Sequence, residues 1–596
     1  MSKATEAMPV WSRASRARDM ERLHDETFDL LVIGGGITGC GLALDGVTRG
    51  LKVALVEQDD FASGTSGRSS RLIHGGLRYL RNGQLGVTLE SSREKKRLLE
   101  NAPHLVRDLP FMLPVSGGLA GRAVLSAGLW GYDRFAGQTK ECERKYLTAE
   151  EAEEYVPGLN HERYQGAFLF HDALADDCRL TLHVIKRAVL AGALAVNYAA
   201  VTELLTTDGR VSGAKVRDVA VDSGGGAGGN GSRSVAPENG ELVLRARAVV
   251  NATGVWADRV RSLALTPARV AAIASPPATA SPPATATAPA TTPASSATDG
   301  SAKAQIKPLL RPSKGVHLII PRERLPISCA VTLPTPGSTE NVFLVPFEAQ
   351  VIVGTTDAFH DGPLARPRAS ADEIDTLLTR VNEGLPRAAL TREDIVSTYA
   401  GLRPLLQTGG GEQDATCASR AEHIAREATG LWTVTGGKLT TYRRMAERAL
   451  DAILADKDGN LGRGSGTSGA LNSPKRPCRT REIELFAASP AEDHLTVNYG
   501  SEARLIRKMM KDDPALSRPL VPGEPVTLGE ARYLLAHERV LHLSDLLIRR
   551  TRLALCAPQM TGKEAAAIAT ALAPQAGWDV TAEVARFLEE ARQFSN

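Results

Sequence analysis

The feature that most constrains this chain is a glycine-rich turn between an apolar segment and a helical pattern. Residues 29–33 (DLLVI) lead into GGGITG at 34–39, the helical pattern ends at Gly50, and a second apolar segment ends at Glu57. Such a unit uses its glycines for a tight turn, for close approach to a pyrophosphate and for helix–strand packing, while the acid accepts hydrogen bonds from a ribose. The residues that we expect to bind a dinucleotide are Gly34, Gly36, Thr38, Gly39 and Glu57.

Composition places the chain among globular proteins with more than one domain. Its 596 residues exceed what a single core usually holds. A formal net charge of +3 gives no argument for a nucleic-acid partner. No stretch approaches the roughly 18 uncharged apolar residues that a membrane-spanning helix needs. Any membrane contact is therefore expected to be peripheral.

The 7 cysteines lie far apart and form no CxxC pair, which indicates free thiols in a reducing compartment. One acidic stretch, at 171–178, superficially resembles a metal cluster. Its members are His171, Asp172, Asp176, Asp177 and Cys178. Their spacing fits no zinc pattern, so we interpret the stretch as a solvated acidic turn before a helix and expect no metal.

Breaks in composition divide the chain into segments. Residues 1–27 lack an apolar run and are expected to form a loosely ordered arm. The Gly-rich stretch at 223–234 lies between strand-like segments and predicts a hairpin tip, whereas the Ala, Pro, Ser and Thr of 262–306 indicate a disordered insertion. A linker is expected at 458–480. The capping box TGKE at 561–564 and helical spacing at 580–594 favour a C-terminal all-α domain over 481–596.

Two further segments bear on the identity of the dinucleotide. The strand pattern at 248–251 runs into Ala252-Thr-Gly254, a small-residue turn that permits close backbone approach. Gly436 and Gly437 precede apolar residues with helical spacing, and a helix N-terminus would supply amide donors to a reduced flavin. Because such distant segments have natural roles around one cofactor, we expect FAD and include these glycines and Ala252 in its site.

Longer motifs resemble one enzyme family. Residues 60–80 read DFASGTSGRSSRLIHGGLRYL, which is similar to the FAD-dependent glycerol-3-phosphate dehydrogenases, the aerobic, respiratory family. The segments GTTD (354–357), YAGLRP (399–404) and TGGKLTTY (435–442) resemble the same family in the same order. The resemblance covers about residues 28–594, apart from the two low-complexity stretches.

The resemblance implies an α/β fold with a Rossmann-like, glutathione-reductase-like FAD domain, a β-sheet substrate domain and the helical C-terminal domain. The implied FAD domain is discontinuous and comprises 28–110, 165–261 and 400–457, and the implied substrate domain comprises 111–164 and 307–399. The implied reaction is oxidation of sn-glycerol 3-phosphate to dihydroxyacetone phosphate by hydride transfer from C2 to flavin N5. Electrons would then pass to a membrane quinone, in glycerol and glycerophosphodiester catabolism and in respiration.

The resemblance also assigns residues by motif. Those implied to hold the substrate are Arg78, Tyr79, Arg403 and Arg420. Those implied to act near the reacting carbon are His317, Lys438 and Arg403. Those implied to line the flavin are Thr65, Ser69, His74, Leu439 and Thr440.

The chemistry asks for groups of these kinds. A dianionic phosphate is suited to the planar fork of arginine, and Arg78, Arg403 and Arg420 come from segments that are otherwise small or apolar. A base must take the hydroxyl proton; histidine has a suitable pKa, and lysine would need a lowered pKa. On this reasoning the base is open between His317 and Lys438.

Several alternatives share these motifs. A glycerol-3-phosphate oxidase would pass electrons to O2, and an FAD-dependent amine or amino-acid oxidase shares the dinucleotide turn. A nucleic-acid-binding flavoprotein is disfavoured because acidic and basic residues interleave over 530–552. The apolar stretch 119–130, with aromatic and basic residues at its edge, suits an interfacial membrane patch or equally a buried helix. We expect a cytoplasmic protein attached peripherally to the inner face of the cell membrane, with a homodimer as one option.

Overall fold

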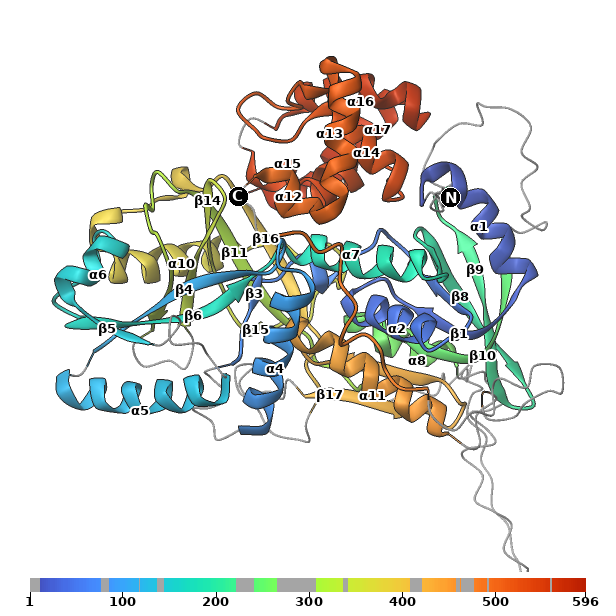
Figure 1. Cartoon of the computed structure of the whole chain (residues 1–596), viewed down its shortest axis with the longest axis horizontal. Helices are drawn as coiled ribbons and strands as arrows, with labels where there is room; N and C mark the ends of the chain where they lie inside the picture. The colour runs from blue at the N-terminus through green and yellow to red at the C-terminus, as the bar shows by residue number, and fades with distance from the viewer. Residues whose placement is uncertain are drawn as a thin grey trace, which may run out of the picture.

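The computed structural model describes residues 11–76, 85–116, 118–136, 144–220, 241–264, 307–335, 341–407, 421–456, 461, 476–489, 493–557 and 560–595. These residues form two β-sheets with flanking helices, and a group of C-terminal helices lies over both (Figure 1). Among the described residues, no helix is both long enough and apolar enough to cross a bilayer.

The first sheet has 8 strands. They are β1 (Thr27–Ile33), β2 (Val53–Val56), β7 (Leu194–Val196), β8 (Ala199–Thr207), β9 (Arg210–Asp218), β10 (Glu241–Asn251), β17 (Glu422–Arg426) and β18 (Trp432–Gly436). The order is β17-β18-β10-β1-β2-β7, with β9 also paired to β10. Strands β18, β10, β1, β2 and β7 run parallel, so their carboxyl ends lie at one edge. The apolar segments predicted on either side of the glycine turn are β1 and β2.

Helix α2 (Ile37–Thr48) connects β1 to β2, and Gly50, with φ of +81°, ends it as predicted. Helices α7 (Asp177–Leu190) and α11 (Tyr442–Ala455) pack against α2. The approach of α11 is close, since a Cβ on Gly41 would lie 2.8 Å from the Tyr442 ring. The helical spacing predicted after Gly437 is confirmed by the burial of Ala446, Ala449 and Ile453 on α11.

The expectation of a loosely ordered N-terminal arm is wrong for its described part. Residues Arg13–Asp25 form helix α1, which begins with a Ser12–Ser15 capping box. On its buried face, Arg16 donates 2.8 and 2.9 Å bonds to Asp218, and Asp19 accepts from Arg539 of the C-terminal region. Both partners lie far away in the sequence, so the segment by itself gave no sign of this packing.

The second sheet has 10 strands. They are β3 (Leu72–Ile73), β4 (Arg107–Pro114), β5 (Lys145–Thr148), β6 (Gly166–Leu174), β11 (Ser313–Pro321), β12 (Ala330–Pro334), β13 (Asn341–Phe347), β14 (Gln350–Gly354), β15 (Ala358–Phe359) and β16 (Ser397–Arg403). Helices α6 (Ala149–Tyr155) and α10 (Ala371–Gly384) pack against it. Strands β4 and β16 span the domain boundaries that the sequence suggested at 110 and 399, and each lies wholly within the second sheet.

The low-complexity stretches connect ordered elements. Strands β9 and β10 pair antiparallel with Arg217 opposite Glu241, as expected for a hairpin, and its tip lies outside the described residues. Helix α8 (Ala257–Leu263) ends inside the range 262–306, of which 265–306 lie outside the described residues. Part of the expected linker is ordered, since Arg476 donates 3.3 Å bonds to the carbonyls of Arg49 and Gly50.

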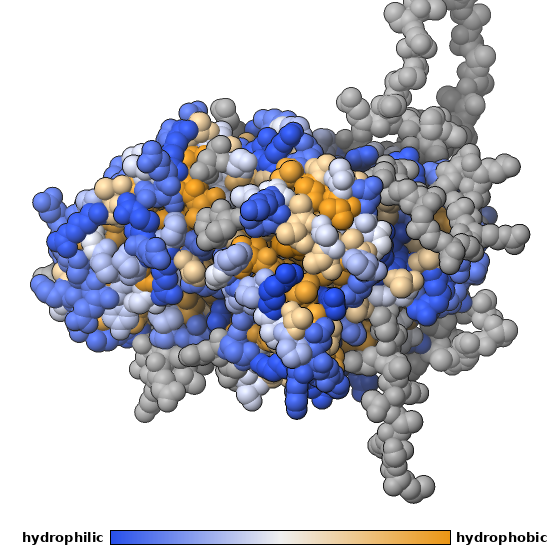
Figure 2. Space-filling model, turned by 90° about the horizontal axis from the view of Figure 1, so that it is seen from above, coloured by the Kyte–Doolittle hydropathy of each residue, from blue (hydrophilic) through white to orange (hydrophobic). Residues whose placement is uncertain are grey.

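The C-terminal region is helical, as predicted. Its helices are α12 (His494–Tyr499), α13 (Ala503–Asp512), α14 (Leu528–His537), α15 (Leu553–Cys556), α16 (Gly562–Ala576) and α17 (Val580–Ala591). The predicted capping box of Thr561 and Glu564 opens α16. Seen from above, over these helices, apolar residues gather at the centre of the face between hydrophilic margins (Figure 2). The first helix of this region begins at His494, later than the boundary expected at residue 481. Leu485, which follows that boundary, packs into the core around α2.

The acidic stretch before α7 is buried, so its interpretation as a solvated turn is wrong. Asp176 caps α7 by accepting from the amide of Arg179 at 2.8 Å, and Asp177 is fully buried. Both carboxylates accept from Arg552 of the C-terminal region, at 2.8 and 2.5 Å. A buried carboxylate needs such a cation, and the sequence places this one 376 positions away from Asp176.

Candidate active site

The carboxyl edge of the first sheet brings together the three glycine-containing turns that the sequence singled out. The Gly34 amide donates to the Val56 carbonyl at 2.9 Å, and the Ala252 amide donates to the Ile33 carbonyl at 2.8 Å. Thr435, at the end of β18, donates to the Gly254 carbonyl at 3.3 Å. The turn after β1, the turn after β10 and the turn after β18 are therefore direct neighbours.

The glycines at this edge leave a cradle of backbone. Gly34 has φ of +113°, and a Cβ there would lie 2.6 Å from the Ala252 carbonyl oxygen. A Cβ on Gly39 would lie 1.9 Å from the Gly34 oxygen. Gly36 caps α2, and Thr38 lies half-buried in its first turn. A helix N-terminus with open backbone beside it suits a pyrophosphate, so these residues fit FAD.

Glu57 lies at the end of β2, beside the glycine turn. Its carboxylate accepts from the Gly35 amide at 2.6 Å and from the Asp59 amide at 2.9 Å. Burial raises the pKa of Glu57 to about 7 although these hydrogen bonds oppose the shift. A ribose hydroxyl is a suitable further partner for this half-buried acid.

The segment at 60–71, which we name the Ser-rich loop, lies between the two sheets. Thr65 donates to the Leu402 carbonyl of β16 at 2.6 Å, and Tyr399 of β16 donates to the Ser69 carbonyl at 2.8 Å. His74 follows the loop, directly after β3, and is half-buried. The loop thus connects the flavin edge to the strands that carry the predicted substrate residues.

His317 lies on β11, opposite Tyr399 of β16, and the two rings stack at 4.5 Å. Its Nε2 lies 2.8 Å from the Ser70 hydroxyl. Burial, together with the cations Arg403 and Arg71, lowers the pKa of His317 to about 3. The imidazole is therefore neutral at physiological pH.

Arg403 ends β16 and is held by the interrupted edge between β14 and β15. Its guanidinium donates to Asp357 at 3.0 Å, to Ser313 at 3.1 Å and to Thr355 at 3.2 Å. Gly315 leaves room for this guanidinium, since a Cβ on Gly315 would lie 2.5 Å from the Arg403 Nη2. These bonds fix the plane of the Arg403 guanidinium. Because 22% of the Arg403 side chain stays exposed, it also remains accessible to a solute.

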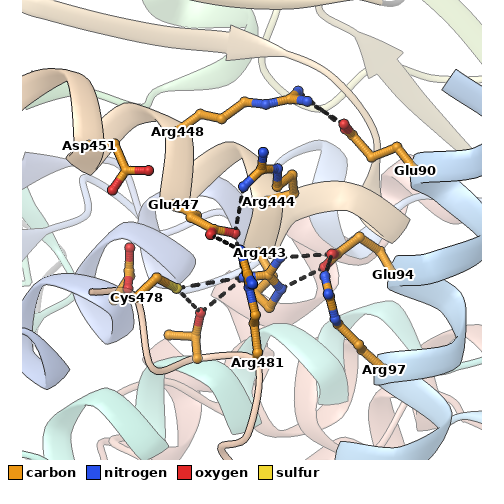
Figure 3. Close-up of polar contacts among 12 residues, drawn as sticks. Glu90, Glu94, Arg97, Arg443, Arg444, Glu447, Arg448, Asp451, Cys478 and Arg481 are labelled. Atoms are coloured by element: carbon orange, nitrogen blue, oxygen red, sulfur yellow. Dashed lines mark hydrogen bonds and ion pairs between the residues drawn. The ribbon is translucent and has the colours of Figure 1, made fainter. Parts of the chain in front are cut away.

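Lys438 lies between β18 and α11, where its Nζ donates to Ser91 at 3.0 Å. Ser91 belongs to α4 (Leu85–Asn101), which follows the LIHGGLRYL motif. Figure 3 shows the ion-pair network that holds α4 to α11. In it, Arg443 donates to Glu94 at 2.6 and 2.7 Å and to Glu447 at 2.9 Å. Leu439 and Thr440 follow Lys438 in a short 3-10 turn at the same edge as Gly436 and Gly437.

The structure tests only part of the expected substrate site. Arg78, Tyr79 and Arg420 lie outside the described residues. His317 and Arg403 occupy neighbouring strands beside the Ser-rich loop. Sequence reasoning missed Ser70 and Tyr399, which hold His317; both lie inside quoted motifs, but nothing in a motif says which of its members face a given side chain.

Comparison of the sequence with known proteins identifies the family to which this chain belongs. A family model described as "FAD dependent oxidoreductase" matches residues 29–301 and 284–444, and one described as "C-terminal domain of alpha-glycerophosphate oxidase" matches 477–583. The chain is 35% identical over 592 residues to glycerol-3-phosphate dehydrogenase 2 of Mycobacterium tuberculosis, which covers 96% of this chain and 90% of the relative.

Further similarities agree with this assignment. Aerobic glycerol-3-phosphate dehydrogenase of Staphylococcus aureus is 36% identical over 74% of this chain and 70% of its own length. The solved structure of glycerol-3-phosphate dehydrogenase from Bacillus halodurans complexed with FAD has a TM-score of 0.71 and 26% identity, with 98% of each chain covered. The chain therefore belongs to the FAD-dependent glycerol-3-phosphate dehydrogenase family.

Proposed function

We propose that the protein oxidises sn-glycerol 3-phosphate to dihydroxyacetone phosphate and passes the electrons to a membrane quinone. FAD, when bound, would supply the acceptor, taking a hydride from C2 at N5. The observation that carries this proposal is that β11 and β16 present His317 and Arg403 beside the Ser-rich loop. The relatives' names support the same substrate.

Arg403 is the proposed phosphate ligand among the described residues. Its bonds to Asp357, Ser313 and Thr355 fix the guanidinium plane before substrate arrives, which lowers the ordering cost of binding. Arg78, Tyr79 and Arg420 are proposed as further substrate ligands on the family motif. Converging cations suit a dianionic phosphate better than the single carboxylate of an amino acid, which favours this substrate over an amine or amino acid.

His317 is the proposed proton acceptor, with Lys438 as a stabilising cation. Only a neutral imidazole can accept a proton, and burial together with Arg403 and Arg71 keeps it neutral. A dianionic phosphate beside Arg403 would offset that cation and raise the pKa of His317, moving it toward the range useful for general-base catalysis. His317→Asn should slow flavin reduction by roughly 10²–10⁴-fold with FAD retained.

The test of the substrate is anaerobic titration with sn-glycerol 3-phosphate while the visible flavin absorbance is followed. Arg403→Met should raise KM by roughly tenfold to a hundredfold, as expected for a lost bond to a charged group. Arg324→Met, which removes an exposed arginine in the turn after β11, is the matched control. If amino acids bleach the flavin and glycerol 3-phosphate does not, the substrate is wrong.

The proposed membrane contact lies at α4 and α5 (Gly118–Ala136), on the side of the molecule opposite the C-terminal helices (Figure 1). Trp130 is 61% exposed, and Leu85 and Val87 of α4 are also exposed. Leu129 is buried in the core and Leu125 packs against it, so the inner side of α5 is not available. Trp130 is thus the better probe, because amphipathic aromatics favour the interface.

Sedimentation with anionic vesicles tests the contact. Trp130→Glu should release the protein while dye-linked activity is unchanged. Leu588→Glu, on the C-terminal helices, is the matched control at another exposed apolar residue. Release by the control alone would move the contact to the C-terminal helices.

Oxygen is the second candidate acceptor, favoured by the match of residues 477–583 to the oxidase C-terminal domain model. If quinone is the acceptor, we expect little peroxide during turnover under air and rapid reoxidation of the reduced enzyme by a quinone analogue. Stoichiometric peroxide formed at the turnover rate would show that oxygen is the acceptor instead.

A further inference from the structure

The Ser-rich loop depends on outside contacts for its shape. Within it, backbone bonds are short-range, such as the Gly67 amide to the Gly64 carbonyl at 3.2 Å. Ala62 and Arg71 have φ of +61° and +60°, a region that L-residues adopt at a cost. A loop that holds such conformations persists only when its surroundings fix it.

One set of outside contacts comes from the second sheet, through Thr65, Ser69 and Ser70 as described above. The opposite set comes from the C-terminal region. Arg552 donates to the Gly67 carbonyl at 3.3 Å and to both Asp176 and Asp177. Asp177 in turn accepts from the Ser69 amide at 2.8 Å. A continuous chain therefore runs from Arg552 through Asp177 and Ser69 to the residue that contacts His317.

The charges of Arg552, Asp176 and Asp177 make this series of contacts hard to replace. Asp176 and Asp177 are adjacent, buried carboxylates, and Arg552 is an equally buried cation that contacts both. Arg552 holds the pKa of Asp176 below its usual range against the burial that would raise it. Without the guanidinium, two like charges would remain close together without the cation that contacts both, and the hydrogen bond that fixes Ser69 would weaken.

We propose that Arg552 is a positioning residue for the flavin site, through which the C-terminal domain fixes the Ser-rich loop against FAD and His317. The C-terminal domain would thereby take part in the chemistry of a site whose described residues come from the two sheets and the Ser-rich loop. It rests on the proposed function for the roles of the loop and His317. It does not depend on the identity of the substrate.

The first experiment measures FAD release from the holoenzyme after dilution, by the fluorescence of free flavin. Arg552→Met should release FAD at least tenfold faster than the wild type. Arg552→Lys should be intermediate, because it keeps the charge but loses the fork that spans both carboxylates and the Gly67 carbonyl. Arg504→Met is the control, since Arg504 is exposed on the same domain. Release at the wild-type rate from both Arg552 variants would overturn the proposal.

The second experiment measures single-turnover flavin reduction by glycerol 3-phosphate, normalised to bound FAD so that unfolded protein does not contribute. Arg552→Met should lower the rate at saturating substrate at least tenfold, while the substrate concentration that gives half of this rate changes less than threefold. If the variant and the wild type are reduced at the same rate per bound FAD, Arg552 does not act on His317 through these contacts. If the wild type itself is not reduced, the proposed function fails and the FAD-release result still decides the role of Arg552.

A double variant covers the case in which Arg552→Met does not fold. Arg552→Met combined with Asp177→Asn removes one of the two buried negative charges together with the cation and keeps an acceptor for the Ser69 amide. It should fold and hold FAD more tightly than the single variant. If neither the double variant nor Arg552→Lys recovers FAD retention, Arg552 does not act through its contacts with Asp177 and Ser69.

Discussion

The two boundaries of the Ser-rich loop are built on different physical principles. At the carboxyl edge of the first sheet, glycines and small residues let three turns approach one another, and fit is set by shape. At the contact with the C-terminal helices, fit is set by charge. There Asp60 is fully buried and accepts from Arg549 at 2.6 Å, from Arg550 and from Asn197 at 3.0 Å.

The difference predicts opposite sensitivities. A shape-built site tolerates changes of charge nearby but not an added methyl group, because the backbone has nowhere to move. A charge-built contact tolerates small changes of volume but not the loss of one partner, because the other is left buried and unpaired.

The largest effect is expected from Gly39→Val. A Cβ at this position would lie 1.9 Å from the Gly34 carbonyl oxygen and 3.3 Å from the Val32 side chain, so α2 must move off the strand. We expect no FAD to remain bound after gel filtration. Gly128→Ala is the control, because a Cβ there meets nothing within 4 Å. Retention of FAD by the valine variant would show that shape at this edge is less restrictive than the comparison holds.

The next effect is expected from Arg550→Met, at the charge-built contact. Removing one partner of a buried ion pair costs about 3–5 kcal/mol. The urea midpoint of the holoenzyme should fall accordingly. Asp60 keeps Arg549, so a value near the lower end is expected. Adding Asp60→Asn should recover part of the loss, and a double variant no more stable than the single one would argue against charge as the cause.

These two regions also differ in how far the sequence predicted them. The glycine turn, its strands and Glu57 were predicted because their signals are local and lie within about thirty residues, as in any βαβ unit. The C-terminal contact was not predicted, since Asp60 pairs with Arg550 across 490 positions and no spacing rule joins them. The interleaved charges of 530–552 were seen, and Glu538, Arg539 and Arg549 indeed belong to a buried packing face. Which acids they meet depends on the tertiary fold alone.

The site shows the same division. His317 and Arg403 were proposed from motifs, and the structure places them on paired strands. Ser70 and Arg71 lie in the same quoted loop, yet their contacts with His317 and with the Phe347 ring at 3.8 Å come from the second sheet. Residues 119–130 were expected to form either a membrane patch or a buried helix, and Leu129 of this stretch is buried, because the inner side of α5 faces the core.

A smaller effect is expected from acid, which should weaken the charge-built contact through two histidines. His104 and His183 lie 5.4 Å apart, buried beside Phe486 and Arg179. Burial, and then the Arg179 cation, lowers the pKa of His104 to about 4, and the pKa of His183 is also lowered. The unfolded chain therefore binds more protons below pH 6.5, so stability is lost as pH falls toward 4, by at most about 1.4 kcal/mol per pH unit for each histidine.

Thermal melting of the holoenzyme between pH 7.5 and pH 4.5 measures this loss. His104→Gln should flatten the dependence, since the glutamine cannot take up a proton, whereas the neighbouring carboxylates are unchanged. A slope equal to that of the wild type would assign the acid sensitivity to the carboxylates of the contact alone.

The smallest effect is expected from Arg392→Met, which removes the same kind of ion pair at the surface. Arg392 and Asp375 approach to 2.7 Å, as closely as many buried pairs, but their side chains are 49% and 56% exposed. Water and salt replace the lost partner, so the urea midpoint should not move measurably. Set beside Arg550→Met, this variant keeps the chemistry constant and changes only burial. An equal shift in both would mean that distance, and not exclusion from water, sets the value of an ion pair here, and the contrast between the two boundaries of the Ser-rich loop would then lose its basis.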